Sequence, residues 1–184
     1  MANNYLEFSE VLPHLTDEEQ RWLEHQLETV CVFDGREYAE NEVPDDLDPD
    51  NAEWRGCRVY RDLDDYDADF GEDAGFQYEF RDEPGDRGRH LWLYAEETAC
   101  VERVAHLVRR FLAAFRPRQC WSLTYAATCS KPRVGEFGGG GVFVTADDVF
   151  WCDAHQFVEQ HLAKAAKSGI HDTRRTATGS RDDA

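Results

Sequence analysis

The segment that decides the fold runs from His90 to Phe115 and has the sequence HLWLYAEETACVERVAHLVRRFLAAF. Its first six residues are almost all apolar or aromatic, which is typical of a β-strand. From residue 98 onward, apolar residues recur every three or four positions and charged residues lie between them, which predicts an amphipathic helix over 98–115. Pro117 prevents its continuation. A strand followed by a long amphipathic helix indicates a sheet covered by helices.

The flanking sequence extends this pattern in both directions. Upstream, an alternating strand over 76–81 is separated from the 90–95 strand by a turn-forming stretch, so the two are expected to form a hairpin. Downstream, strands are expected over 120–126 and 142–145. Nearer the N-terminus, strands are expected over 30–33 and 57–62, and 5–9 is expected to be a short strand, with a helical turn as the alternative.

Two further helices are predicted from their capping residues. Thr16 and Glu19 form a capping-box pattern ahead of a helix over 17–29. Asp153 is the expected N-cap of a final helix to 167, which should turn Phe157, Val158, Leu162 and Ala165 inward. The sequence therefore predicts an α+β domain over 1–167, followed by a flexible tail over 168–184. Its antiparallel or mixed sheet should have five to seven strands, with three helices mainly on one face.

The composition restricts the class of protein. The chain of 184 residues has a formal net charge of −18, with 12% aromatic residues. Direct binding to nucleic acid or to an anionic membrane is disfavoured, because phosphate groups would be repelled, and basic protein partners are favoured. There is no basic, apolar leader and no apolar run long enough to span a membrane, so a cytoplasmic protein is expected. Six dispersed cysteines without a C-x-x-C pair predict mostly buried, reduced thiols, no metal site and no cofactor.

The acidity is concentrated in one region. Residues 34–87 hold twenty Asp or Glu against six Arg, a net charge of −14, whereas residues 88–135 have a net charge of +5. A calcium loop starting at Asp65 fails, because Phe70 and Phe76 occupy the positions that require Gly and Glu.

The acidic region has two remaining interpretations. One is a solvated face, partly neutralised by the +5 segment. The other is a mimic of nucleic acid, because alternate residues of an extended chain lie about 6.6 Å apart, close to the spacing of two phosphate steps. The candidate partner-binding residues are Asp45, Asp46, Asp48, Asp50, Asp62, Asp64, Asp65, Asp67, Asp69, Glu72 and Asp73.

A glycine-rich segment, Lys131 to Gly141, is the second candidate site. Its backbone N–H groups could receive an anion, although it lacks the ending of a P-loop. The alternative is a flexible hairpin connection. The candidate ligand-binding residues are Lys131, Arg133, Glu136, Gly138 and Gly139. Cys129 lies beside Lys131 and Arg133 in sequence, which makes it a weak candidate nucleophile.

The segment from Cys120 to Ala146, CWSLTYAATCSKPRVGEFGGGGVFVTA, together with LWLYAEE at 91–97, resembles a small uncharacterised family of bacterial and phage proteins. The resemblance spans residues 5 to about 162. It implies no activity and no catalytic residues, but it directs attention to Cys129–Gly141.

Taken together, the residues favour a non-enzymatic binding protein. It would inhibit or regulate a nucleic-acid-binding protein by occupying its basic surface, as phage anti-restriction or anti-CRISPR proteins do. A small-ligand-binding module, or an enzyme that uses the Cys129 to Gly141 loop, is the alternative. Neither the partner nor the oligomeric state follows from the sequence.

Overall fold

The computed structural model describes residues 4–48, 50, 52–61, 74–83, 88–131 and 136–167. Within these residues the strands are β1 (Asn4–Leu12), β2 (Thr29–Phe33), β3 (Arg36–Ala39), β4 (Glu53–Cys57), β5 (Gln77–Glu83), β6 (Gly88–Ala95), β7 (Trp121–Cys129), β8 (Gly138–Val144) and β9 (Val149–Asp153). The helices are α1 (Asp17–Leu27), the one-turn α2 (Arg58–Arg61), α3 (Val101–Phe115) and α4 (Ala154–Lys167), with a 3-10 turn at Glu40–Glu42.

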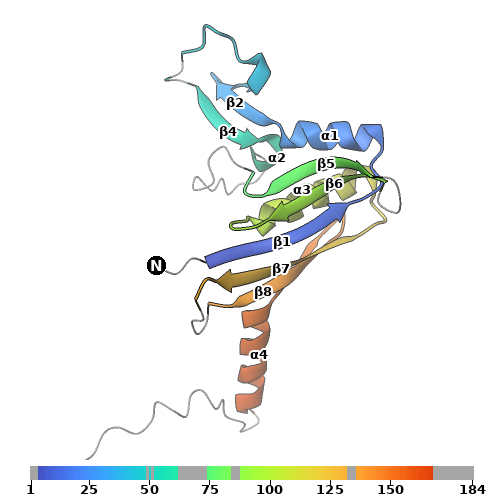
Figure 1. Ribbon diagram of the computed structural model, residues 1–184, viewed down its shortest axis with the longest axis vertical. Coiled ribbons are helices and arrows are strands. Elements are labelled where there is room, and N and C mark those ends of the chain that lie inside the picture. Colours follow the sequence, from blue (N-terminus) through green and yellow to red (C-terminus); the bar gives the residue numbers. More distant parts are fainter. Residues whose placement is uncertain are drawn as a thin grey trace, which may run out of the picture.

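Six strands form the main sheet, in the order β5-β6-β1-β7-β8-β9. Every neighbouring pair in it is antiparallel, and β5 and β6 form the expected hairpin. Strand β1 lies in the middle, between β6 and β7, so the N-terminal segment joins the two halves of the sheet (Figure 1). This arrangement confirms the predicted α+β class and the expected number of strands.

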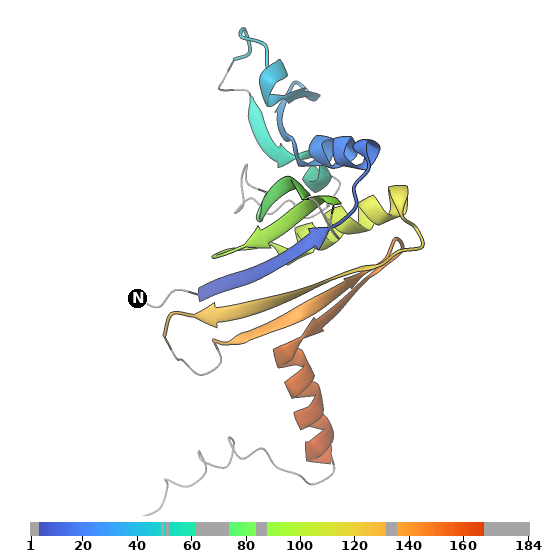
Figure 2. The same cartoon turned by 45° about the vertical axis from the view of Figure 1, so that its right-hand side comes forward.

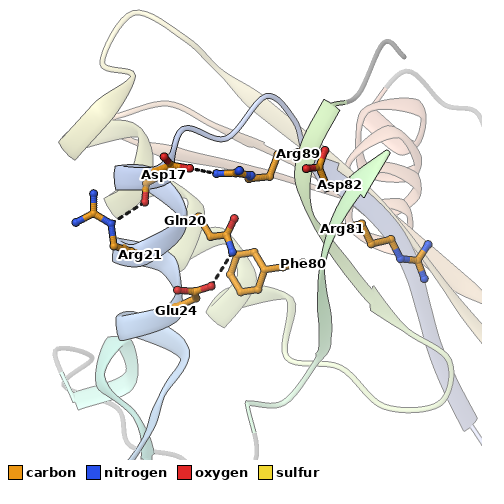
Figure 3. Close-up of a pocket in the computed structure, with 8 residues that line it drawn as sticks. All are labelled: Asp17, Gln20, Arg21, Glu24, Phe80, Arg81, Asp82 and Arg89. Atoms are coloured by element: carbon orange, nitrogen blue, oxygen red, sulfur yellow. Dashed lines mark hydrogen bonds and ion pairs between the residues drawn. The ribbon is translucent and has the colours of Figure 1, made fainter. Parts of the chain in front are cut away.

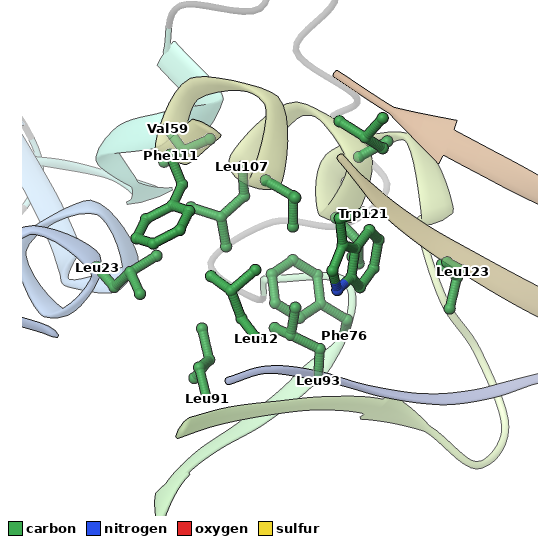
Figure 4. Close-up of a cluster of buried hydrophobic side chains, with 14 of the residues drawn as sticks. Leu12, Leu23, Val59, Phe76, Leu91, Leu93, Leu107, Phe111, Trp121 and Leu123 are labelled. Carbon is green, nitrogen blue, oxygen red and sulfur yellow. The ribbon is translucent and has the colours of Figure 1, made fainter. Parts of the chain in front are cut away.

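The hydrophobic core lies between this sheet and helices α1 and α3. Phe111 and Leu107 of α3 point toward Leu12 of β1 and Leu91 of β6 (Figure 4), and all four are almost completely buried. Helix α1 packs beside α3, where the ring centroids of Trp22 and Phe111 are 6.2 Å apart. Burial of each such side chain contributes about 1.5–3 kcal/mol to the stability of the fold. The apolar residues that recur at helical spacing are the ones that α3 buries, so their burial holds α3 against the sheet.

A smaller sheet, ordered β3-β2-β4, lies at one end of the molecule (Figures 1 and 2). Its β2–β3 hairpin turns at Asp34 and Gly35. Their φ angles, 48° and 72°, are both positive, as in the two-residue turns that are common in tight hairpins. The predicted strand over 57–62 is wrong. Strand β4 ends at Cys57, after a register shift against β2 at which Gly56 has a φ of 67°, and α2 follows at once and buries Val59 in the core.

Two other expectations differ from the structure. Strands β7 and β8 do form a hairpin, but Gly138–Gly141, expected in its connection, are the first residues of β8. Asp153 does cap α4, since its Oδ1 accepts a hydrogen bond from the N–H of Gln156 at 2.9 Å. However, Phe157 and Val158 of that helix are exposed rather than turned inward. The predicted tail at 168–184 lies outside the described residues.

Candidate functional site

Among the described residues, the exposed acidic side chains are densest in the smaller sheet and its loops. We call residues 34–53 the acidic lobe. The segment contains nine carboxylates and a single basic residue, Arg36. All nine carboxylate residues are exposed: Asp34, Glu37, Glu40, Glu42, Asp45, Asp46, Asp48, Asp50 and Glu53. The lobe therefore presents its charge to solvent rather than to the core.

Turns and strand register fix the positions of these carboxylates. Leu47 donates its N–H to the carbonyl of Pro44, which forms a tight turn around Asp45 and Asp46. Asp48 closes a second turn by accepting the N–H of Asp50 at 3.1 Å. In the sheet, Glu37 and Glu53 both lie opposite Val32, one on each neighbouring strand. Strands about 4.8 Å apart place these two residues on either side of the central strand.

Few of the lobe's charges are neutralised. Arg55 pairs with Glu53 at 2.5 Å, and Arg58 lies 4.0 Å from Glu37 while also pairing with Glu28 of the preceding segment. Five other carboxylates, in the β2–β3 turn, the 3-10 turn and the Pro44 turn, form no ion pair with a Lys or Arg among the described residues. They are Asp34, Glu40, Glu42, Asp45 and Asp46. The other predicted partner-binding residues, Asp62, Asp64, Asp65, Asp67, Asp69, Glu72 and Asp73, lie outside the described residues.

Part of the +5 segment is occupied away from the lobe. Two of its arginines pair with α1. Arg89 binds Asp17 (Figure 3), and its hydrogen bond lowers the pKa of that carboxyl. Arg116 binds Glu19, with its Nε 2.6 Å from the carboxylate. The groove of about 550 Å³ beside Asp17 and Arg89 contains both signs of charge, including Arg21 and Glu24, so it does not favour an ion of either sign.

The glycine-rich segment is explained by packing rather than by ligand binding. A Cβ atom on Gly140 would lie 2.6 Å from the hydroxyl of Tyr125, and one on Gly138 would lie 2.8 Å from the imidazole of His155. These side chains occupy the space above the two glycines, so a larger residue there would require Tyr125 or His155 to shift. Of the other candidates, Lys131 is exposed, Glu136 bonds Cys129, and Arg133 lies outside the described residues. An anion-binding role for Gly138 and Gly139 therefore stays a prediction.

Cys129 has the surroundings of a structural thiol. It is 8% exposed, and its thiol donates to the Glu136 carboxylate at 2.9 Å. Reactive cysteines are typically accessible and lie near positive charge, and this arrangement is the opposite. Of the six free cysteines, Cys31 and Cys57 are also buried, whereas Cys120 and Cys152 are exposed.

Alkylation should therefore label Cys120 and Cys152 first. We expect iodoacetamide at neutral pH to modify both at least tenfold faster than Cys129, because access to the thiol limits the reaction. Mass spectrometry of peptides from a time course measures the three rates. Faster labelling of Cys129 would revive its assignment as a nucleophile.

The face of the main sheet opposite α1 and α3 carries a shallow cavity of about 580 Å³. Trp92 and Tyr94 stack there with ring centroids 3.9 Å apart, and the guanidinium of Arg81 lies 3.9 Å from the Trp92 ring. Trp92 Nε1 donates to the hydroxyl of Ser9 at 2.9 Å. Glu7 and other residues of β1 and β7 complete the lining. Aromatic residues on strands under helices usually belong to the core, so the sequence favours a core position for Trp92 and Tyr94, with a ligand or partner surface as the alternative.

No family of known proteins matches the chain, and comparison with curated proteins and with solved structures also gave no match. The resemblance carried by the Cys120–Ala146 segment therefore stays an expectation. Across the described ranges, no three His, Cys, Asp or Glu residues lie where they could hold a metal ion together. None of the helices in the described part of the chain has the length and hydropathy required to cross a membrane.

Proposed function

We propose that the protein is a non-enzymatic inhibitor or regulator that binds the basic surface of a nucleic-acid-binding protein through its acidic lobe. The observation that carries the proposal is the exposure of all nine carboxylates between Asp34 and Glu53 against a single Arg in the same segment. Such a surface attracts cationic grooves and repels phosphates. The proposal places the protein in the cytoplasm, where such partners act, and includes the anti-defence role of phage inhibitors.

Two features support a partner surface over a self-neutralised face. The arginines of the +5 segment that form ion pairs with α1 bind Asp17 and Glu19, so they are not available to the lobe. The turns at Pro44 and Asp48 also hold neighbouring carboxylates in defined positions, which lowers the entropy lost when they bind.

The test compares two variants that remove the same charge from different places. The lobe variant changes Asp45, Asp46, Asp48 and Asp50 to Asn. The control changes Glu18, Glu24, Asp147 and Glu159, which are exposed and lie outside the lobe, to the corresponding amides. The partner is first captured from nuclease-treated lysate, purified, and titrated by calorimetry and by displacement of a labelled DNA duplex.

We expect the lobe variant to bind at least tenfold more weakly, because four exposed charge pairs of about 0.5 kcal/mol each correspond to a factor of this size. The control should stay within about threefold, because its charges act only through the long-range field. Equal losses of affinity in both variants would mean that net charge alone accounts for binding. Failure to displace the duplex would refute the proposed mimicry.

A small-ligand-binding module is the second candidate, and the cavity at Trp92 and Tyr94 favours it. Its stacked rings suit a planar ligand. A thermal-shift screen of nucleosides and aromatic amines measures this directly. A stabilising compound that loses its effect in a Trp92→Ala variant would support the candidate, and no shift across the screen would count against it.

A further inference from the structure

Strand β9 is an edge strand without the usual protection. It lies at the end of the six-stranded sheet, next to β8, so its outer backbone groups have no strand partner in the described part of the chain. Its sequence, VFWCD, has a single charge, at its last residue. Exposed apolar edges of this kind pair readily with another strand.

The other edges of the two sheets differ from β9. Strand β5, at the opposite edge of the main sheet, carries Glu79, Arg81, Asp82 and Glu83. Strands β3 and β4, at the edges of the small sheet, carry charged residues of both signs as well. Charges at these edges disfavour association, and β9 differs from the other edge strands in the described part of the chain.

Apolar side chains are exposed on both faces of β9. Phe150 is 54% exposed and lies beside Phe143 of β8, with ring centroids 6.2 Å apart. Trp151 points to the opposite face and is 45% exposed. Together β8 and β9 contain one charged residue, Asp153, in a chain of net charge −18. Two copies of this acidic chain would repel each other least at this edge.

Helix α4 extends past this edge. Figures 1 and 2 both show it running from the end of the sheet in the direction in which further strands would be added. Its first turn lies on the same face as α3, where His155 covers Gly138. A helix of fourteen residues is about 21 Å long, which corresponds to about four strands. Phe157, 55% exposed, and Val158 lie on this projecting helix.

We propose that two copies of the chain associate through antiparallel pairing of β9 with β9, and that each α4 packs against the other copy. A second copy fits because it supplies a matching edge strand that carries the same single charge. With Trp151 on the two-fold axis, Phe150 of one copy lies opposite Cys152 of the second copy. Lys164 and Lys167, in the last turn of α4, would then approach an acidic neighbour.

The test is the mass of the full-length chain by sedimentation velocity, from about 1 to about 100 µM and at about 0.5 M salt to screen repulsion. We expect a dimer that dissociates on dilution. Trp151→Lys should weaken it at least tenfold, since a central Trp is a typical binding hot spot. Gln77→Lys adds the same charge to the opposite edge, at β5, and should leave the dimer unchanged.

A second variant guards against misfolding of the first. Phe157→Lys changes an exposed residue of α4 and leaves the monomer core intact, and it should also weaken the dimer at least tenfold. A monomer at every concentration would overturn the proposal. So would a dimer that withstands both variants, or one that Gln77→Lys disrupts equally. This inference does not depend on the proposed function, because the acidic lobe lies at the other end of the molecule (Figure 1).

Discussion

Replacing Glu19 with alanine is expected to lower the free energy of unfolding by about 3–5 kcal/mol, because the change leaves a mostly buried arginine without its partner. Glu19 is 6% exposed, and its two carboxylate oxygens accept from Nε and Nη2 of Arg116 at 2.6 and 3.0 Å. The same carboxylate accepts the N–H of Thr16 at 2.8 Å, which completes the capping box of α1.

The size of this effect follows from what the pair connects. Arg116 follows α3 directly, and its guanidinium also donates to the carbonyls of Pro13 and His14 between β1 and α1. One ion pair therefore links the start of α1, the loop before it and the end of α3. Urea denaturation measures the loss. Glu18→Ala, an exposed neighbour in the same helical turn, is the control and should change stability by less than about 0.5 kcal/mol.

The pair also predicts a pH dependence. Burial raises the pKa of Glu19, but hydrogen bonds from Arg116 and Thr16 outweigh it, and the pKa falls below its ordinary value of 4.5. Because the folded-state pKa is the lower one, the stabilisation is complete above the unfolded pKa and is lost as pH falls through the folded pKa. Glu19→Gln keeps the capping residue but cannot titrate, so its stability should fall less below pH 4.5 than that of the parent. Parallel acid curves would contradict this assignment.

The parts of the fold that were predictable from the sequence depend on local patterns. The spacing of Val104, Leu107 and Phe111 indicates α3, and Thr16 with Glu19 indicates the start of α1. Strand β4 and helix α2 were not predictable, because β4 contains an irregularity at Gly56, which has a positive φ, and α2 depends on a core position for Val59. Burial of a side chain by distant elements leaves no periodic signal in a segment this short.

The candidate site was predictable only in part. The density of Asp and Glu locates the acidic lobe, and charge runs are normally solvated, so the exposure of Asp45 and Asp46 could be expected. The pairing of Arg89 and Arg116 with α1 could not, because residues about 70 to 100 positions apart meet there. For the same reason the stacking of Arg81 on Trp92 appears only when β5 and β6 pair.

If both proposals hold, the dimer has two acidic lobes. The β9 edge and α4 lie at one end of the molecule, and the small sheet with its carboxylates lies at the other (Figures 1 and 2). Association through β9 would therefore leave each lobe exposed. A bivalent acidic protein would bind a dimeric basic partner more tightly than one lobe alone, without any new contact.

Replacing Gly140 with alanine is expected to lower the free energy of unfolding by about 3 kcal/mol, which is the upper part of the range for forcing extra volume into packed structure. The added Cβ would lie 2.3 Å from the carbonyl oxygen of Cys152 on β9 and 2.6 Å from the hydroxyl of Tyr125 on β7. Tyr125 is the register partner of Gly140, and its ring fills the space that a side chain would take. One of the two neighbouring strands must therefore move.

Gly141→Ala is the matched control in the same strand. Its Cβ would meet nothing closer than the carbonyl oxygen of Leu123 at 3.4 Å, which is an ordinary contact. Stability should therefore change by less than about 1 kcal/mol, with a small entropic gain from the loss of glycine. Urea denaturation of the two variants and the parent at one ionic strength gives the comparison. Equal stability of the two variants would show that the glycines serve chain flexibility, as the sequence alone had suggested, and not the close packing of Tyr125 against β8.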